Sequence, residues 1–81
     1  MNLGYALESA GRFDEAIATY RTALEVQSGH MPTIQALARL QVVEDKVDSQ
    51  TCDLLKEIAL RGEDDDWRDW AQLELAKRRG N

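Results

Sequence analysis

The sequence has little cysteine, proline or histidine and no long apolar run, and each shortage excludes a class of protein. Among its 81 residues there is one cysteine. A single cysteine cannot form an internal disulfide, so we expect a reducing, cytoplasmic compartment. No apolar run approaches the roughly 18 residues that cross a bilayer, and no basic-then-apolar signal opens the chain. If the chain is a piece of a longer protein, a targeting signal would lie outside it.

A basic segment is also missing. Residues 1–30 carry 2 − 4 = −2, residues 31–62 carry 4 − 5 = −1, and residues 63–81 carry 4 − 6 = −2. Nucleic-acid-binding domains concentrate lysine and arginine on one surface. RNA binding is therefore disfavoured, and we attribute the net charge of −5 to solubility.

No group of residues predicts catalysis or metal binding. The one histidine, His30, lies in an expected turn beside Gly29 and Pro32, with no nucleophile placed for it to activate. The acidic run at residues 63–66 lacks the alternating ligands and the glycine of a cation-binding loop. These acids instead suit a helix start, where they meet the positive end of the macrodipole. We expect no enzyme, metal or cofactor, and a packing role for Cys52.

The sequence does contain a helical pattern, clearest in Leu3–Ser28, LGYALESAGRFDEAIATYRTALEVQS. Gly11 is typical of a helix end, because glycine adopts a positive φ without strain. Beyond it, residues at i, i+4, i+7 and i+8 give the second helix one apolar face: Ala16, Tyr20, Ala23 and Leu24. The stretch predicts two helices folded against each other, with Gly4 and Ala16 allowing close approach.

The same stretch resembles the tetratricopeptide repeat, whose 34-residue period carries W-x₂-L-G-x₂-Y, then A-x₃-F, then P. Leu3-Gly4 matches the L-G pair, and Ala16-x₃-Tyr20 matches A-x₃-F. Ala23 follows where the family also favours a small residue. The resemblance implies stacked antiparallel helical hairpins.

Three features depart from the family pattern. Leu7 occupies the Tyr position, Ser28 replaces the Pro, and the tryptophan position would precede Met1. The first turn of the family's first helix is therefore missing here.

A degenerate second repeat follows at a shift of 34. The positions of the tryptophan, leucine and glycine in W-x₂-L-G are here occupied by Ile34, Leu37 and Ala38. Pro32 suits the first turn of the helix that carries these residues. Asp48 or Ser49 can cap the helix after it. The apolar stripe of that later helix is Leu54, Leu55 and Ile58. Gln41 again departs from the family's Tyr, and Gln50 replaces an expected alanine, which predicts wider packing. The linker at residues 44–46 lacks glycine, so we expect a looser turn.

A last helix starts the pattern a third time. Trp67-x₂-Trp70-Ala71 resembles W-x₂-L-G, at a shift of 67 − 34 = 33 from Ile34, and Leu73 extends the apolar face. We expect both indoles to be largely buried against the preceding helix. With no partner helix after it, this helix caps the stack or opens a third repeat.

These patterns predict one all-α domain over residues 1–81. It comprises a first repeat at 1–30, a degenerate repeat at 31–62, and a capping helix at 63–81. Five helices are expected near residues 2–10, 12–27, 32–43, 49–61 and 65–79, with no strand.

In the family, the first helix of each repeat lines a concave groove that holds partner peptides. Carried over by position, the resemblance implies these groove residues: Tyr5, Glu8, Ser9, Gln35, Arg39, Val42, Arg68 and Gln72. The lysine and asparagine set of the carboxylate-clamping subgroup is absent. We expect a protein-interaction module, with a self-associating structural unit, formed through an exposed amino-terminal edge, as the alternative.

Arg39 and Arg68 form a separate hypothesis. If both point into the groove beside Tyr5, they form a positive spot suited to an acidic segment of a partner. Otherwise they pair with neighbouring acids, Arg68 with Asp64 or Asp65 in particular.

Overall fold

The computed structural model describes residues 3–79, which form five α-helices and no strand. The helices are α1 (Leu3–Ser9), α2 (Phe13–Val26), α3 (Met31–Val43), α4 (Ser49–Arg61) and α5 (Asp65–Arg79). The predicted all-α class is confirmed, and the observed bounds lie close to the expected ones. Asn2, expected to open the first helix, lies outside the described residues. Within residues 3–79, every helix is too short or too polar to cross a bilayer.

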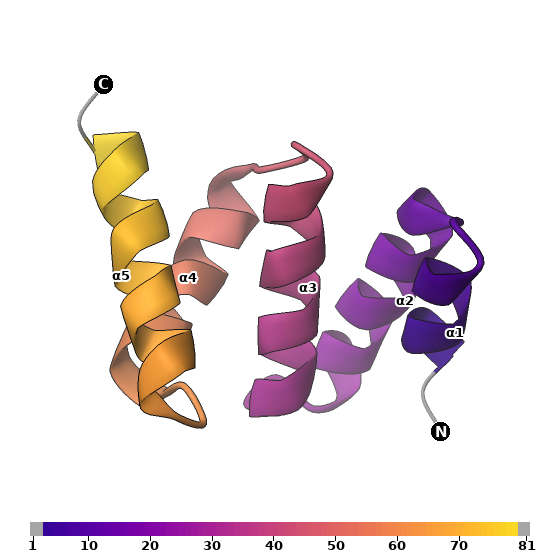
Figure 1. Ribbon diagram of the computed structural model, residues 1–81. Helices are drawn as coiled ribbons and strands as arrows, with labels where there is room; N and C mark the ends of the chain where they lie inside the picture. Colours follow the sequence, from indigo (N-terminus) through magenta and orange to yellow (C-terminus); the bar gives the residue numbers. More distant parts are fainter. Residues whose placement is uncertain (1–2, 80–81) are drawn as a thin grey trace.

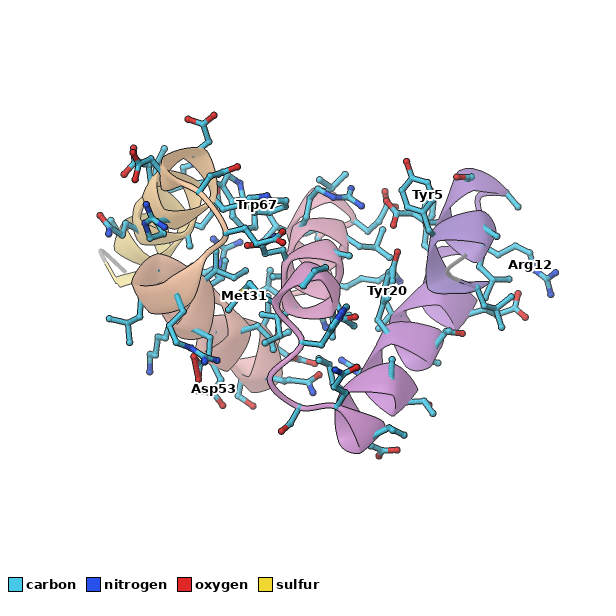
Figure 2. All side chains as sticks on the ribbon, turned by 90° about the horizontal axis from the view of Figure 1, so that it is seen from below. Tyr5, Arg12, Tyr20, Met31, Asp53 and Trp67 are labelled. Carbon is cyan, nitrogen blue, oxygen red and sulfur yellow. The ribbon has the colours of Figure 1, made fainter. Side chains whose placement is uncertain are left out.

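The helices alternate between two layers, as Figures 1 and 2 show from two directions. Helices α1, α3 and α5 form one layer, and α2 and α4 form the other. Each helix packs against the next one in the chain, so the molecule is a row of helices measuring 33 × 23 × 20 Å. We call the outer surface of the first layer the α1/α3/α5 face.

The core is built from the apolar stripes of the long helices, and most of the predicted positions are buried. The buried apolar residues are Ala16, Ile17, Tyr20 and Leu24 on α2, Ile34, Leu37, Ala38 and Leu40 on α3, Leu54, Leu55 and Ile58 on α4, and Ala71 on α5. Two predictions of burial are wrong: Ala23 is exposed, and Leu73 is 58% exposed. Leu73 lies two residues beyond Ala71, about 200° around the helix, so it faces solvent.

Leu3 is a further departure, because it is 63% exposed rather than packed. Leu37, which lies 37 − 3 = 34 residues further along the chain, is fully buried. The difference arises from neighbours: α3 lies between α2 and α4, whereas α1 packs mainly on α2. The outer edge of the α1–α2 hairpin is therefore open in this chain.

Gly4 lies where α1 and α2 approach most closely. A Cβ atom added to Gly4 would lie 2.6 Å from Cε1 and 2.8 Å from Cδ1 of Tyr20. Carbon atoms do not approach so closely without one of them moving, and the Tyr20 ring is buried. The predicted close crossing is present, but the residue facing Gly4 is Tyr20 rather than Ala16.

The turn after α1 is a Schellman motif closed by two backbone hydrogen bonds. The N–H of Arg12 donates to the carbonyl of Leu7 over 2.9 Å, and the N–H of Gly11 donates to Glu8 over 3.0 Å. Gly11 has φ = 81°, the left-handed conformation that this motif requires.

The turn after α3 repeats that motif at a shift of 45 − 11 = 34. The N–H of Lys46 donates to Gln41 over 2.7 Å, and the N–H of Asp45 donates to Val42 over 3.2 Å. Asp45 takes the left-handed position with φ = 56°, which aspartate tolerates better than most residues. The predicted looser turn is therefore wrong: the geometry survives without glycine.

The start of α4 explains both glutamines that depart from the family pattern. Asp48 and Thr51 form a capping box, as the N–H of Thr51 donates to Asp48 Oδ1 over 3.0 Å. The buried Thr51 hydroxyl also donates to Gln41 Oε1 over 2.8 Å. Gln50, in place of an alanine, accepts a 2.8 Å hydrogen bond from Arg21 of α2. Polar contacts thus join α4 to α3 through Gln41 and to α2 through Gln50.

Gly4→Leu should lower the free energy of unfolding by about 1–3 kcal/mol, the usual cost of overpacking. The new side chain must displace the buried ring of Tyr20, and the better helix propensity of leucine offsets only part of this cost. Urea denaturation followed by circular dichroism measures the change. Equal stability of the variant and the native chain would contradict the close approach.

Asp45→Gly should raise the stability by about 1 kcal/mol, because glycine removes the left-handed strain of an L-residue. Gly11→Ala, at the equivalent turn, should lower it by a similar amount. Thermal unfolding of the two variants provides the comparison. If the two substitutions changed the stability in the same direction, the two turns would not be equivalent.

Candidate functional site

The residues expected in a groove on α1 are accessible to different degrees. Tyr5 is 63% exposed and Ser9 is exposed. Glu8 is partly buried and has two partners: its Oε1 accepts a 3.1 Å hydrogen bond from Tyr20 Oη, and its Oε2 pairs with Arg39. Glu8 therefore joins α1 to α2 and α3, and of the three predicted residues on this helix, Tyr5 and Ser9 are the ones a partner can reach.

The phenol of Tyr20 is held neutral by this arrangement. Burial of the ring, followed by its hydrogen bond to the Glu8 carboxylate, raises the pKa of Tyr20 from 10.0 to about 12. The Arg39 guanidinium compensates the Glu8 charge on the other side. The positive charge of Arg39 is thus already matched within the chain.

Two further predicted residues form contacts within the chain, although the Arg68 side chain, like that of Arg39, stays 35% exposed. Gln35 is buried, its Nε2 donates to Glu63 Oε1 over 2.7 Å, and its Oε1 accepts from the Glu63 N–H over 2.9 Å. Arg68 donates to the carbonyl of Gly62 over 2.7 Å and pairs with Asp65. Both side chains connect the α4–α5 turn to the helices around it.

The two remaining predicted residues lie at the surface of α3 and α5. Val42 is half-buried and Gln72 is exposed. The predicted set is therefore not one continuous group. A partner can reach six of them to some degree, namely Tyr5, Ser9, Arg39, Val42, Arg68 and Gln72, whereas Gln35 is buried and the Glu8 side chain is 14% exposed.

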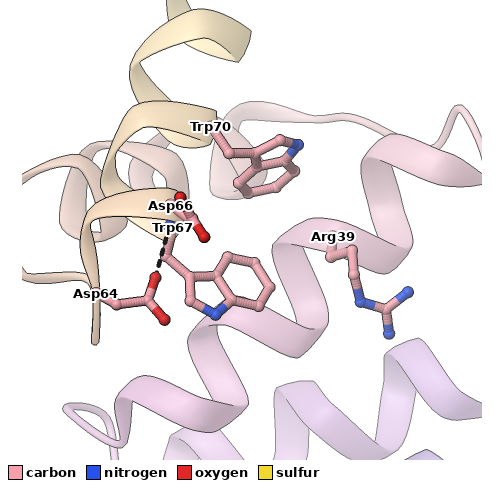
Figure 3. Close-up of a pocket in the computed structure, with 5 residues that line it drawn as sticks. All are labelled: Arg39, Asp64, Asp66, Trp67 and Trp70. Atoms are coloured by element: carbon pink, nitrogen blue, oxygen red, sulfur yellow. Dashed lines mark hydrogen bonds between the residues drawn. The ribbon is translucent and has the colours of Figure 1, made fainter.

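A pocket of about 360 Å³ lies between α3 and α5, and the sequence analysis did not predict it. Its walls are Arg39 from α3, Asp64 from the turn before α5, and Asp66, Trp67 and Trp70 from the first turns of α5. Figure 3 shows both indoles extending from α5 into the space beside α3. Figure 2 shows Trp67 and Tyr5 on the same side of the molecule.

The local sequence explains how the indoles come together. Asp64 caps α5, since its Oδ1 accepts the N–H of Trp67 over 2.9 Å (Figure 3). Positions i and i+3 share a helix face, so Trp67 and Trp70 pack edge to face, with centroids 5.5 Å apart and planes at 88°. Both indoles are partly buried and pack against the core, which agrees with the large burial expected of them. The signal that would have found the pocket is this tryptophan pair directly after an acidic run.

The mouth of the pocket is acidic. Between residues 63 and 69 there are five acids and one base, 1 − 5 = −4. Asp65 pairs with Arg68 and Glu63 bonds to Gln35, whereas Asp64 and Asp66 line the pocket and are exposed. Among residues 3–79, no group of three potential ligands is placed to hold a metal ion.

A second hollow, of about 440 Å³, lies at the outer edge of the α1–α2 hairpin. Its lining is mostly apolar and small: Leu3, Ala18, Thr19, Thr22 and Ala23. This is the edge that the exposed Leu3 leaves open.

Comparison with protein-family models, curated proteins and solved structures finds no match for this chain. The candidate site is therefore inferred from its geometry alone.

The raised pKa of Tyr20 predicts a pH dependence of stability. The neutral phenol is favoured in the folded state, so its contribution is complete below pH 10.0, the unfolded pKa, and is lost as the pH rises towards 12. Tyr20→Phe should therefore flatten the alkaline decrease in stability, and should cost about 1 kcal/mol at neutral pH. Urea midpoints against pH, with Tyr5→Phe as the matched control, measure this. An identical alkaline decrease in Tyr20→Phe and the native chain would contradict it.

Proposed function

We propose that this chain is a tetratricopeptide-like helical-repeat module that binds a segment of a partner protein on its α1/α3/α5 face. The two turns with left-handed residues, at Gly11 and Asp45, support the repeat assignment, since their spacing equals the family period. The alternation of helices between two layers also supports it (Figure 1).

The observation that carries the proposed function is the pocket between α3 and α5. Specific binding sites are concave and lined by aromatic groups with a few polar ones, and this pocket falls within their usual size range. Tryptophan and arginine are also the residues most enriched at interface hot spots. Trp67 and Trp70 keep part of their surface exposed although both are large apolar residues.

The first hypothesis about the partner, an acidic segment bound by Arg39 and Arg68, loses its basis. Each guanidinium has a carboxylate partner within the chain, Glu8 and Asp65 respectively. The proposed binding surface instead comprises the pocket together with Tyr5 and the exposed residues of α1 and α3 near it.

The two tryptophans are the only ones in the chain, so their emission reports directly on the pocket. A displayed peptide library should yield ligands that change this emission on binding. Trp70→Phe, Tyr5→Ala and the control Leu60→Ala, an exposed apolar residue of α4 in the other layer, should all remain folded by circular dichroism.

Affinity for a selected peptide should fall about tenfold in Trp70→Phe or Tyr5→Ala, the scale of a modest hot spot, and stay unchanged in Leu60→Ala. A library without ligands, or ligands that bind all four proteins equally, would refute the proposed function. Neither result would contradict the fold described above.

A second candidate function is self-association through the amino-terminal edge. Leu3 and the apolar hollow beside it favour this candidate, because exposed apolar surface commonly marks an interface. Sedimentation over a concentration series compares the native chain with Leu3→Glu and the control Leu60→Glu. A molecular mass that stays at 9.2 kDa throughout rules out self-association.

A further inference from the structure

We infer that the pocket between α3 and α5 receives a basic side chain, lysine or arginine, from the partner segment. This inference rests on the proposed function and specifies the chemistry of its ligand. Three features of the pocket support it: its indoles, its carboxylates and the pairing of its one cation.

The indoles supply the attraction that a cationic side chain needs beyond charge. Tryptophan has the strongest cation–π interaction of the aromatic residues. The edge-to-face packing of Trp67 and Trp70 places two perpendicular ring systems beside one space. The aliphatic stem of a lysine or arginine can pack on one indole while its charged end reaches the rim.

The carboxylates make the rim selective for positive charge. Within residues 3–79, the Asp64 side chain accepts only the backbone N–H of Trp67, through Oδ1, so Oδ2 remains for a ligand. Asp66 lines the pocket and is exposed. Two aspartates next to two indoles match the guanidinium or ammonium group, which combines hydrogen-bond donors with a cationic surface.

Arg39 is the one cation in the pocket wall, and its charge does not oppose this ligand. Its guanidinium pairs with Glu8 of α1. Figure 3 shows it turned away from the indole of Trp67. The charged residues that line the pocket, Asp64, Asp66 and Arg39, sum to 1 − 2 = −1. Glu8 lies outside the lining, and its charge offsets that of Arg39.

The test uses the ¹⁵N-labelled chain, in which each indole N–H gives its own resonance. The probes are glycine–serine peptides that each carry two lysines, two arginines, two norleucines or two glutamates. Norleucine preserves the aliphatic stem of lysine without its charge. The lysine and arginine peptides should shift both indole resonances, more weakly as salt is raised, whereas the norleucine and glutamate peptides should not.

Asp66→Asn removes one rim charge at an exposed position, and Asp53→Asn removes one charge from the exposed surface of α4 as the matched control. Figure 2 shows Asp53 far from Trp67. Affinity for the lysine peptide should fall about two- to fivefold in Asp66→Asn, the range for an exposed ion pair, and stay unchanged in Asp53→Asn.

The outcomes separate the inference from the proposed function. Equal binding of the norleucine peptide, preferred binding of the glutamate peptide, or no shift with any probe at millimolar concentration overturns the inference. A library-selected peptide that still depends on Trp70 would, in each of these cases, leave the proposed function in place. Equal losses in Asp66→Asn and Asp53→Asn also overturn the inference, because they would show a non-specific charge effect.

Discussion

The buried side chain of Tyr20 connects three of the five helices. Its ring fills the space that Gly4 leaves open, and its hydroxyl donates to Glu8, which in turn pairs with Arg39. Helix α1 has only seven residues and buries only Gly4, and a helix so short has little stability of its own. Its attachment therefore depends on this contact. The same chain of polar groups positions Arg39, which forms the α3 wall of the pocket.

The position of α5 has a separate origin in the turn before it. Gln35 of α3 binds both the backbone and the side chain of Glu63, and Asp64 caps the helix that follows. A buried amide that forms hydrogen bonds at both ends is costly to displace. These contacts hold the α4–α5 turn against α3, and α5 with its pocket residues starts from this turn. Gln35, which a surface interpretation assigns to partner binding, thus joins α3 to the α4–α5 turn instead.

Local signals predicted the helices but only part of the candidate site. The apolar stripes of α2, α3 and α4 follow from helical periodicity, and the Asp48 cap follows from residue type. The groove residues were carried over by position from the family pattern, which gives the face of a helix but not its neighbours. Gln35 lies on the expected helix yet is buried, because the α4–α5 turn folds over it.

The sequence by itself determined the all-α class, the ends of the helices and the spacing of the two equivalent turns. These depend on contacts between residues a few positions apart, so they are encoded locally. The tertiary structure decided that Arg39 pairs with Glu8, that Tyr20 rather than Ala16 faces Gly4, and that the tryptophans line a pocket with Arg39. Those features depend on pairs far apart in the chain, such as Glu8 and Arg39. Periodicity carries no information about such distances, because they are set only when the helices pack.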